Sequence, residues 1–242
     1  MTMGAEITGE TADPPFPPRH PHVNGGCWRR GPNACKGRRM VTARRRERLE
    51  RVARLRDLAA AVVLEDIHDP HNAAASFRSC DAFGIQNVHI IFEHEKPFNP
   101  QRIGKKTSGH TSKWLDFHLH HGTEAAVRAL KARGHTLIAT KVNPAARPLP
   151  AVDLAAIARP AFVFGNEHRG ISPAMEEAAD ILVWLPMLGF AESFNLSVSV
   201  SITLYEYFCQ TRLGRAPATP AIAPAHTPEH DALLARWLGE DG

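Results

Sequence analysis

The sequence lacks the glycine-rich signatures of the common nucleotide-binding folds. No G-x-G-x-x-G follows a predicted strand, and no G-x-x-x-x-G-K-[ST] occurs anywhere in the 242 residues. A Rossmann-type or P-loop phosphate site therefore has little support. The chain also has no apolar run of about 18 residues and no N-terminal hydrophobic stretch typical of a signal peptide. These absences favour a cytoplasmic protein without a membrane segment.

Cysteine is also scarce, and its spacing excludes two kinds of site. The four cysteines form no C-x-x-C pair, so neither a zinc site nor a disulfide framework is predicted. Histidine is more abundant, with fourteen residues. Alternation in WLDFHLHH places His118 and His120 on one side of a strand. Because no carboxylate or cysteine stands at ligand spacing, we expect no metal site.

Positive charge is concentrated near the N-terminus. Residues 1–48 contain ten Lys/Arg and four Asp/Glu, whereas residues 49–242 contain nineteen and twenty-one. Mobile guanidinium groups in the first segment could neutralise phosphates, although charge alone is equally compatible with a solvated tail. Residues 1–41 are predicted to form a disordered basic tail rich in Pro and Gly, and residues 42–60 a basic amphipathic helix.

The rest of the chain alternates strand-like and helix-like segments. This pattern predicts an α/β domain over residues 61–212, with a mostly parallel sheet flanked by helices. Residues 213–242 read as a linker and a short C-terminal helix. Thr123 and Ser172 are predicted helix N-caps. The predicted strands are AVVLE (61–65), VHIIF (88–92), WLDFH (114–118), TLIATK (136–141), AFVFG (161–165) and ILVWLP (181–186).

The segment NLSVSVSITLYEY is ambiguous on local evidence. Apolar residues recur at every second position from Leu196 to Leu204, and several of them are β-branched. Period-two alternation with β-branched residues favours a strand over a helix. Local sequence alone therefore predicts a strand here.

Three separate stretches carry the chemistry: DPHNAAASFRSCDAFG (69–84), FGNEHRGIS (164–172) and LPMLGFAESFNLSVS (185–199). Each joins the end of an apolar run to polar residues or glycine at a predicted strand-to-helix turn. Open α/β sheets place their ligand sites at such turns, outside the carboxyl ends of the strands. We therefore interpret the three stretches as parts of one site.

In this order and spacing, the three motifs resemble the SpoU branch of the SPOUT RNA methyltransferases, and most of all the TrmH-type tRNA 2′-O-ribose methyltransferases. The resemblance covers about residues 42–212, with a weaker similarity in DALLARWL (231–238). It implies a deep C-terminal trefoil knot, a helix instead of a strand after Asn195, a homodimer and S-adenosylmethionine as cofactor.

The implied reaction is methylation of a ribose 2′-hydroxyl in structured RNA, with the D-loop guanosine of tRNA as the leading target. A ribosomal RNA guanosine is the near alternative. A catalytically silent RNA-binding or ribosome-assembly protein of the same fold is the alternative from another class. Few aromatic residues are available for base stacking, so the sequence favours recognition of the RNA backbone and shape.

The resemblance also assigns residues, and it assigns no metal ligand. Arg78 matches the catalytic arginine, and the accompanying polar residues are Asn72, Glu167, Ser193 and Asn195. We expect Arg78 to hold the target phosphate and stabilise the developing alkoxide, while the phosphate or Glu167 helps to take the proton. The predicted cofactor residues are Thr140, Val142, Gly165, Asn166, Glu167, Gly170, Pro186, Met187, Gly189 and Leu196. The predicted RNA-binding residues are Arg44, Arg45, Arg46, His71, Lys105, Lys106, Lys113 and Arg169.

Several of these assignments have ordinary alternatives when each residue is taken singly. Glu167 could form a surface ion pair with Arg169, Ser193 could cap the last helix, and Asn195 could be a turn residue. The joint occurrence of the motifs favours the functional interpretation over these alternatives.

Overall fold

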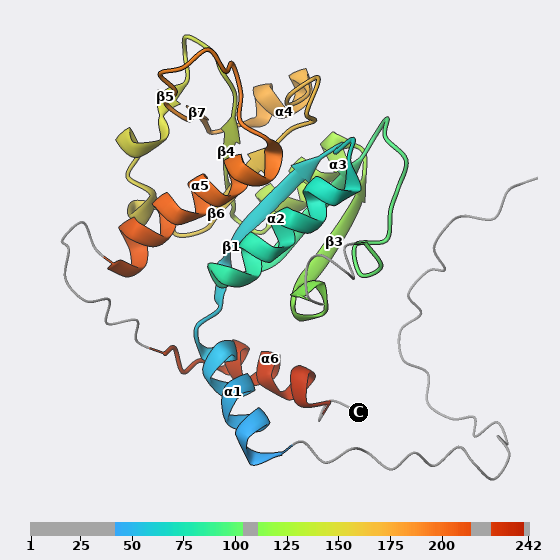
Figure 1. Ribbon diagram of the computed structural model, residues 1–242, viewed down its shortest axis with the longest axis vertical. Coiled ribbons are helices and arrows are strands. Elements are labelled where there is room, and N and C mark those ends of the chain that lie inside the picture. The colour runs from blue at the N-terminus through green and yellow to red at the C-terminus, as the bar shows by residue number, and fades with distance from the viewer. Residues whose placement is uncertain (1–41, 104–110, 214–223, 240–242) are drawn as a thin grey trace, which may run out of the picture. The chain divides into compact units, whose positions relative to one another are not determined.

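The computed structural model describes residues 42–103, 111–213 and 224–239, so the predicted tail 1–41 lies outside the described residues. Its centre is a seven-stranded sheet in the order β3-β2-β1-β6-β4-β7-β5, in which every neighbouring pair is parallel (Figure 1). The strands are β1 (Asp57–Glu65), β2 (Ile85–Phe92), β3 (Asp116–His121), β4 (Thr136–Thr140), β5 (Arg147–Pro148), β6 (Pro160–Phe164) and β7 (Ile181–Trp184). The α/β class with a parallel sheet is thus confirmed.

Helices α2 (Pro70–Ala82) and α5 (Leu196–Phe208) cover one face of the sheet, and α3 (Thr123–Ala132) and α4 (Pro173–Ala178) cover the other. The remaining helices, α1 (Ala43–Arg54) and α6 (Pro228–Leu238), pack against each other. Because successive strand residues point to opposite faces, Val62 of β1 packs in the cluster that contains residues of α2 and α5, whereas Val63 packs with residues of α3 and α4. Among the described residues, no helix is long and apolar enough to cross a membrane.

The basic helix ends earlier than predicted. It was expected over residues 42–60, but α1 ends at Arg54 and β1 begins at Asp57. Arg56 between them is buried and forms an ion pair with Asp81 at the end of α2, and the Asp57 N–H donates to Gly84 O at 2.7 Å. These contacts with distant residues stabilise an extended backbone after Leu55, so the helix ends and the strand begins.

The ambiguous segment after Asn195 is a helix, so the prediction from local periodicity was wrong and the one from family resemblance is confirmed. The Asn195 side chain caps α5 by accepting from the Ser197 N–H at 2.9 Å. Leu196, Val200 and Leu204 are buried and recur every four residues, which places them on one helical face. Packing against α2 therefore overrides the β-propensity of this segment.

One of the two predicted helix caps is correct. The Ser172 hydroxyl accepts from the Met175 N–H at 3.1 Å and caps α4. Thr123 is instead the first residue of α3, and Gly122 occupies the cap position with φ of 94°. The Thr123 hydroxyl lies 2.6 Å from Glu65 Oε1 and 2.7 Å from Glu93 Oε2. These two carboxylates provide acceptors that sequence periodicity did not indicate.

Candidate functional site

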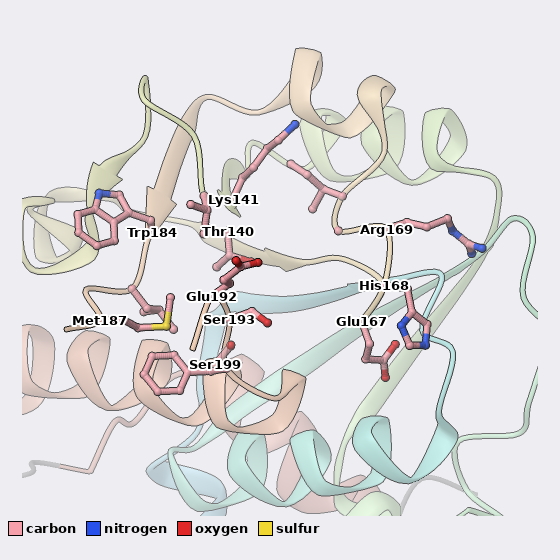
Figure 2. A pocket seen from close by; sticks show the side chains of 15 residues that line it. Thr140, Lys141, Glu167, His168, Arg169, Trp184, Met187, Glu192, Ser193 and Ser199 are labelled. Atoms are coloured by element: carbon pink, nitrogen blue, oxygen red, sulfur yellow. The ribbon is translucent and has the colours of Figure 1, made fainter. Parts of the chain in front are cut away.

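A pocket of about 390 Å³ opens beside the loops that follow β4, β6 and β7 (Figure 2). Trp184 and Met187 lie at one end, Glu167 and Arg169 at the other, and Ser193 between them. Its apolar wall consists of Val142, Ile171, Trp184, Leu185, Met187 and Phe194, and its other lining residues are Thr140, Lys141, Glu167, His168, Arg169, Gly170, Glu192, Ser193 and Ser199. This mixture of apolar walls and a few polar groups is typical of small-molecule sites.

The three motifs meet in hydrogen bonds next to this pocket, at what we call the motif junction: Asn72, Glu167 and Asn195. The Glu167 carboxylate accepts from Asn72 Nδ2 at 2.9 Å across 95 positions of sequence. Asn195 Nδ2 donates to Asn72 Oδ1 at 3.1 Å across 123 positions. The prediction that the three stretches lie together agrees with this geometry.

Helix starts orient the side chains of the motif junction. Asp69 caps α2 by accepting from the His71 N–H at 2.8 Å, which places Asn72 in the first turn. Asn195 caps α5, so its Oδ1 is occupied by Ser197 and its Nδ2 is directed toward Asn72. Glu167 also accepts from the backbone N–H groups of His68 at 2.9 Å and Asp69 at 3.4 Å. A carboxylate with three donors has a fixed orientation.

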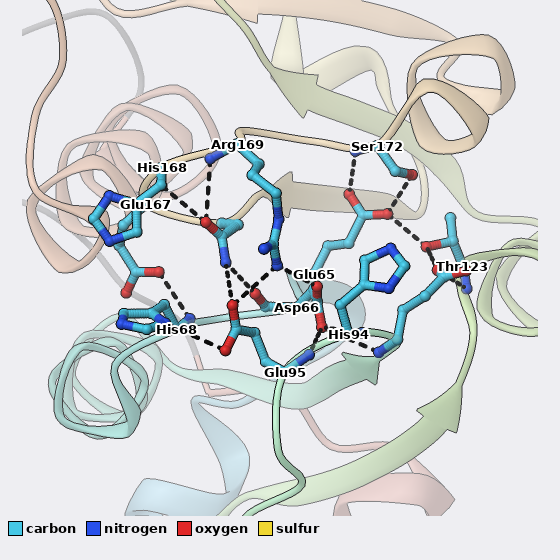
Figure 3. Close-up of polar contacts among 12 residues, drawn as sticks. Glu65, Asp66, His68, His94, Glu95, Thr123, Glu167, His168, Arg169 and Ser172 are labelled. Atoms are coloured by element: carbon cyan, nitrogen blue, oxygen red, sulfur yellow. Dashed lines mark hydrogen bonds and ion pairs between the residues drawn. The ribbon is translucent and has the colours of Figure 1, made fainter.

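A second set of polar contacts, the strand-end network, holds the loop after β6 in place (Figure 3). It consists of Asp66, His68, Glu95, Asn166 and Arg169. Arg169 Nη2 lies 2.7 Å from Asp66 Oδ2 and 3.0 Å from Glu95 Oε1, so Arg169 pairs with these carboxylates and no ion pair to Glu167 is found among the described contacts. Asn166 Nδ2 donates to the Asp66 carbonyl at 2.7 Å.

The electrostatics of this network favour ionised carboxylates. Burial alone would raise the pKa of Asp66, but backbone N–H donors of residues 93–95 and the Arg169 guanidinium lower that pKa overall. Hydrogen bonding to His68, followed by Arg169, lowers the pKa of Glu95. Asp66 also has φ of 53°, a left-handed conformation that Asp tolerates better than most residues. The carboxylates of Asp66, after β1, and Glu95, after β2, therefore anchor the loop that follows β6.

Glycine is required where this loop closes on itself. The backbones of Asn166 and Gly170 exchange hydrogen bonds of 3.0 and 2.8 Å. A Cβ on Gly165 would lie 2.1 Å from the carbonyl carbon of Gly170, far inside contact distance. Gly170 itself has φ of 68°. The narrow loop that places Glu167 is thus built around two glycines.

The predicted cofactor residues fall into two groups. Those that line the pocket are Thr140, Val142, Glu167, Gly170 and Met187, together with Ser193 from the predicted catalytic set. Gly165, Asn166, Pro186 and Gly189 lie in the same loops and Leu196 begins α5, but none of them lines the pocket. Sequence reasoning missed Lys141, His168, Ile171, Trp184, Leu185, Glu192, Phe194 and Ser199. Most of these flank a motif residue directly, which is the signal that could have identified them.

Arg78 lies apart from the pocket lining. It is exposed on α2, two residues beyond the buried Ser76, and shares an exposed stripe with His71 and Ala75. Arg78 and Asn72 are separated by six residues, so they occupy different sides of α2. The motif junction and the arginine therefore face different directions within one chain.

The predicted RNA-binding residues are mostly on the surface. Arg44, Arg45 and Arg46 are exposed on α1, and His71 and Lys113 are exposed as well. Arg169 is 52% exposed at its side chain, although it is paired with Asp66 and Glu95. Lys105 and Lys106 lie outside the described residues.

The fold and the pocket together define an α/β protein with a candidate ligand site in loops at the carboxyl ends of a parallel sheet, without a glycine-rich phosphate loop. Within that class, the model of the SpoU rRNA Methylase family matches residues 59–205. The chain belongs to this family, as the motifs predicted.

Individual relatives agree with the family match. A tRNA (guanosine(18)-2′-O)-methyltransferase of Thermus thermophilus is 36% identical over 199 residues, which cover 81% of this chain and 97% of the relative. The enzyme of the same name from Borreliella burgdorferi is 33% identical over 175 residues, 72% and 77% of the two chains. The crystal structure of the TrmH/SpoU tRNA modifying enzyme of Aquifex aeolicus superposes with a TM-score of 0.70 at 27% identity, covering 82% of this chain and 96% of that one.

Proposed function

We propose that this chain transfers a methyl group from S-adenosylmethionine to the ribose 2′-hydroxyl of guanosine 18 in the D-loop of tRNA. The observation that carries the proposal is the motif junction, in which Glu167, Asn72 and Asn195 meet beside a pocket of about 390 Å³. The named activity of the Thermus thermophilus and Borreliella burgdorferi relatives supports the choice of substrate. Because tRNA is the proposed substrate, we place the enzyme in the cytoplasm.

The pocket fits S-adenosylmethionine in size and chemistry. Its volume lies within the range of about 300–1,000 Å³ usual for small ligands. Trp184, Leu185 and Met187 offer apolar surface for an adenine, and Glu167 and Glu192 offer negative charge that suits a sulfonium. When bound, the cofactor supplies an electrophilic methyl group and needs no phosphate-binding loop. Thr140, Val142, Gly170 and Ser193 complete the set of residues proposed to hold it.

The chain's own residues then supply positioning and charge. Asn72 donates to Glu167 and accepts from Asn195, so it links all three motifs and fixes the loops that shape the pocket before the RNA binds. The Arg78 guanidinium holds the target phosphate and stabilises the developing alkoxide, since it does not lose its proton in proteins. The phosphate or the Glu167 carboxylate takes the proton of the 2′-hydroxyl.

The role of Arg78 is tested by replacing it with lysine. Lysine keeps the charge but lacks the planar fork, so we expect Arg78→Lys to lower kcat about 100-fold while the Kd for tRNA changes less than about threefold. Turnover close to that of the wild type with unchanged RNA affinity would contradict the proposed role. Arg128→Lys on α3, which is equally exposed, is the matched control.

We also infer a deep C-terminal trefoil knot. β7 lies between β4 and β5 toward one edge of the sheet, yet α5 packs on α2 and β6 near its centre. The connection over residues 185–195 must therefore return across the sheet from β7 to α5 (Figure 1). This return path and the family membership support the knot.

A homodimer completes the proposal. Val198, Ile202 and Tyr205 are exposed by 42, 37 and 56%, and they recur at helical spacing along one side of α5. Such an unpartnered apolar stripe is typical of a contact surface, and α2 with Arg78 lies against the same helix.

We expect Ile202→Glu to convert a dimer to a monomer in light scattering and to abolish activity. Arg128→Glu on α3 should change neither, and an active Ile202→Glu monomer would refute the dimer requirement.

The reaction itself is tested with purified protein and radiolabelled S-adenosylmethionine. We expect label in a tRNA transcript with guanosine 18, none in a transcript with adenosine 18, and none in ribosomal RNA. Label confined to ribosomal RNA would favour the rRNA alternative. Absence of label with every RNA, together with no heat on mixing protein and cofactor in calorimetry, would favour a silent RNA-binding protein.

A further inference from the structure

A second cavity of about 430 Å³ lies between α1, α6 and the turn before β3 and shares no lining residue with the cofactor pocket. We call it the tryptophan cavity. Four cations, one carboxylate and two tryptophans dominate its lining, which consists of Arg45, Arg48, Leu49, Val52, Arg56, Asp81, Lys113, Trp114 and Trp237. The methyl-transfer function proposed above assigns no role to the two tryptophans.

Several contacts fix the walls of the tryptophan cavity. His230 Nε2 donates to the Arg56 carbonyl at 2.9 Å, and Arg54 pairs with Asp231 at 2.7 Å. Both guanidinium Nη atoms of Arg236 donate to the Asp116 carboxylate, at 3.0 and 2.9 Å. A bidentate pair adds geometric specificity to the attachment of α6. The C-terminal helix is therefore held against α1 and the start of β3.

Buried charge shapes the floor of the cavity. Arg56 is 2% exposed, forms an ion pair with Asp81, and lies 5.3 Å from the ring centroid of Trp237. Its Nε is buried and has no hydrogen-bond partner among the described residues. A buried donor without an acceptor is unfavourable, and a polar group of a bound ligand could satisfy it. Because Asp81 is already paired with Arg56, the remaining cations determine the charge of the cavity.

The lining of the tryptophan cavity combines half-buried aromatic rings with exposed positive charge. Trp114 and Trp237 stand edge to face, with ring centroids 5.1 Å apart, and Lys113 Nζ lies 4.5 Å above the Trp114 ring. Arg45, Arg48 and Lys113 are exposed at the rim. A ligand that matches both properties has an aromatic base and a phosphate, and is therefore a nucleotide.

Positive charge continues beyond the cavity along α1, where Arg44 and Arg51 are also exposed. A free nucleotide would need only the cavity, whereas a polyanion would use the whole basic helix. We propose that the tryptophan cavity binds an unpaired nucleotide of the RNA substrate, with its base against Trp114 and Trp237 and its phosphate against Arg45, Arg48 and Lys113. The proposal rests on the proposed RNA-methylating function and adds base stacking to the recognition of RNA backbone that the sequence predicts.

The test measures RNA binding separately from turnover. Trp237→Leu removes the aromatic face while keeping an apolar side chain, and we expect it to raise the Kd for tRNA about tenfold. Lys113→Ala should raise the Kd about threefold and reduce the salt dependence of binding by about one phosphate contact. Both variants should keep wild-type affinity for S-adenosylmethionine, because the tryptophan cavity shares no lining residue with the cofactor pocket. Arg128→Ala, which removes one exposed cation from α3, should bind tRNA as the wild type does.

Competition experiments identify the bound group. A single-stranded RNA octamer should displace tRNA from the wild type but not from Trp237→Leu, and Trp237→Phe should restore most of the competition. A duplex of the same length that competes equally well would overturn base stacking, and guanosine monophosphate that competes as well as the octamer would overturn the assignment to RNA.

Two outcomes separate this proposal from the one on which it rests. If the enzyme methylates tRNA but Trp237→Leu and Lys113→Ala both keep wild-type tRNA affinity, the proposed role of the tryptophan cavity is refuted and the proposed function is not. A wild-type protein that methylates no RNA would refute the proposed function, whatever its binding. If Trp237→Leu does not fold, as judged by circular dichroism, the exposed Lys113→Ala and Arg45→Ala variants decide the question.

Discussion

Two groups of polar side chains on the same sheet have opposite electrostatic character. The strand-end network and the motif junction lie where β1 and β6 end, and the carboxylates of the network are stabilised in the ionised form. The histidine cluster, His89, His118, His120 and His135, lies within β2 and β3 and just before β4. The contrast teaches that position along the strand decides whether a polar group serves chemistry or packing.

Burial in the histidine cluster lowers the pKa values of His89, His120 and His135 and so favours their neutral forms. His89 is 1% exposed and stacks on His118 at 4.4 Å and on His120 at 5.2 Å between ring centroids. His89 Nδ1 lies 2.9 Å from His120 Nε2, and no described carboxylate approaches. Burial, followed by the neighbouring histidines, lowers the pKa of His89 to about 2. Among the described residues, no group of three or more His, Cys, Asp or Glu could hold a metal ion. Because the rings of His118 and His120 stack on His89, we interpret this cluster as a packing feature.

The largest effect on activity is expected from a change at Glu167, in the motif junction. Glu167→Ala leaves the His68 N–H, the Asp69 N–H and Asn72 Nδ2 without their shared acceptor. We expect kcat/KM to fall about 100-fold, because the motif junction and a candidate proton acceptor are lost together. Glu177→Ala, an exposed carboxylate on α4, should change kcat/KM less than twofold. Equal activity of the two variants in steady-state assays would remove Glu167 from the site.

The histidine cluster should affect the pH dependence of stability and not the rate of methyl transfer. A folded-state pKa below the unfolded value means that the unfolded chain takes up protons first, so this contribution to stability is present above about pH 6.5 and is lost as pH falls. Between pH 7 and pH 5 we expect His89 to account for about 2 kcal/mol of lost unfolding free energy. Urea unfolding of His89→Leu should show a correspondingly smaller loss. His121→Ala, at an exposed histidine, should keep the wild-type slope.

Asp66 should show the same sign of pH dependence as His89, but in a lower pH range. Asp66→Asn tolerates φ of 53° and keeps an acceptor oxygen, but it removes the charge that pairs with Arg169. We expect a loss of about 1 to 2 kcal/mol at pH 7. Since the pKa of Asp66 is lowered, its stabilisation is present above the unfolded pKa and lost below it. The difference between wild type and variant in urea unfolding should therefore shrink as pH falls from 6 to 3, and a constant difference would contradict this account.

The smallest effect is expected between α2 and α5, away from both groups. Ser79 Oγ and Ser201 Oγ lie 2.7 Å apart, and Ser201 also donates to the Ser197 carbonyl. Ser201→Ala should cost about 1 kcal/mol of unfolding free energy with no change in kcat. A change in kcat larger than any change in stability would show that this contact reaches the site.

Sequence patterns predicted the carboxyl ends of most strands, because a buried parallel strand leaves a continuous apolar run and its turn leaves glycine and polar residues. The exception is β3, which ends at His121 and not at His118. The predictions failed where contacts with residues far away in sequence determine the local structure. Thr123 lies at two carboxylates from β1 and the β2 loop, and α1 ends early because Arg56 pairs with Asp81. The pocket residue Trp184 became recognisable only when separate loops converged, whereas Lys141 and Glu192 stand directly beside the predicted residues Thr140 and Ser193.

The sequence by itself determined the family, the parallel α/β class and the edge of the sheet that carries the site, since motif order and apolar periodicity are local properties of the chain. Only the tertiary structure decided that residues 196–208 form a helix, because its buried face exists only against α2. It alone brought Trp114 to within 5.1 Å of Trp237 and Asn195 to Asn72. Contacts between segments more than 100 residues apart depend on how the chain folds back on itself, which no local pattern records.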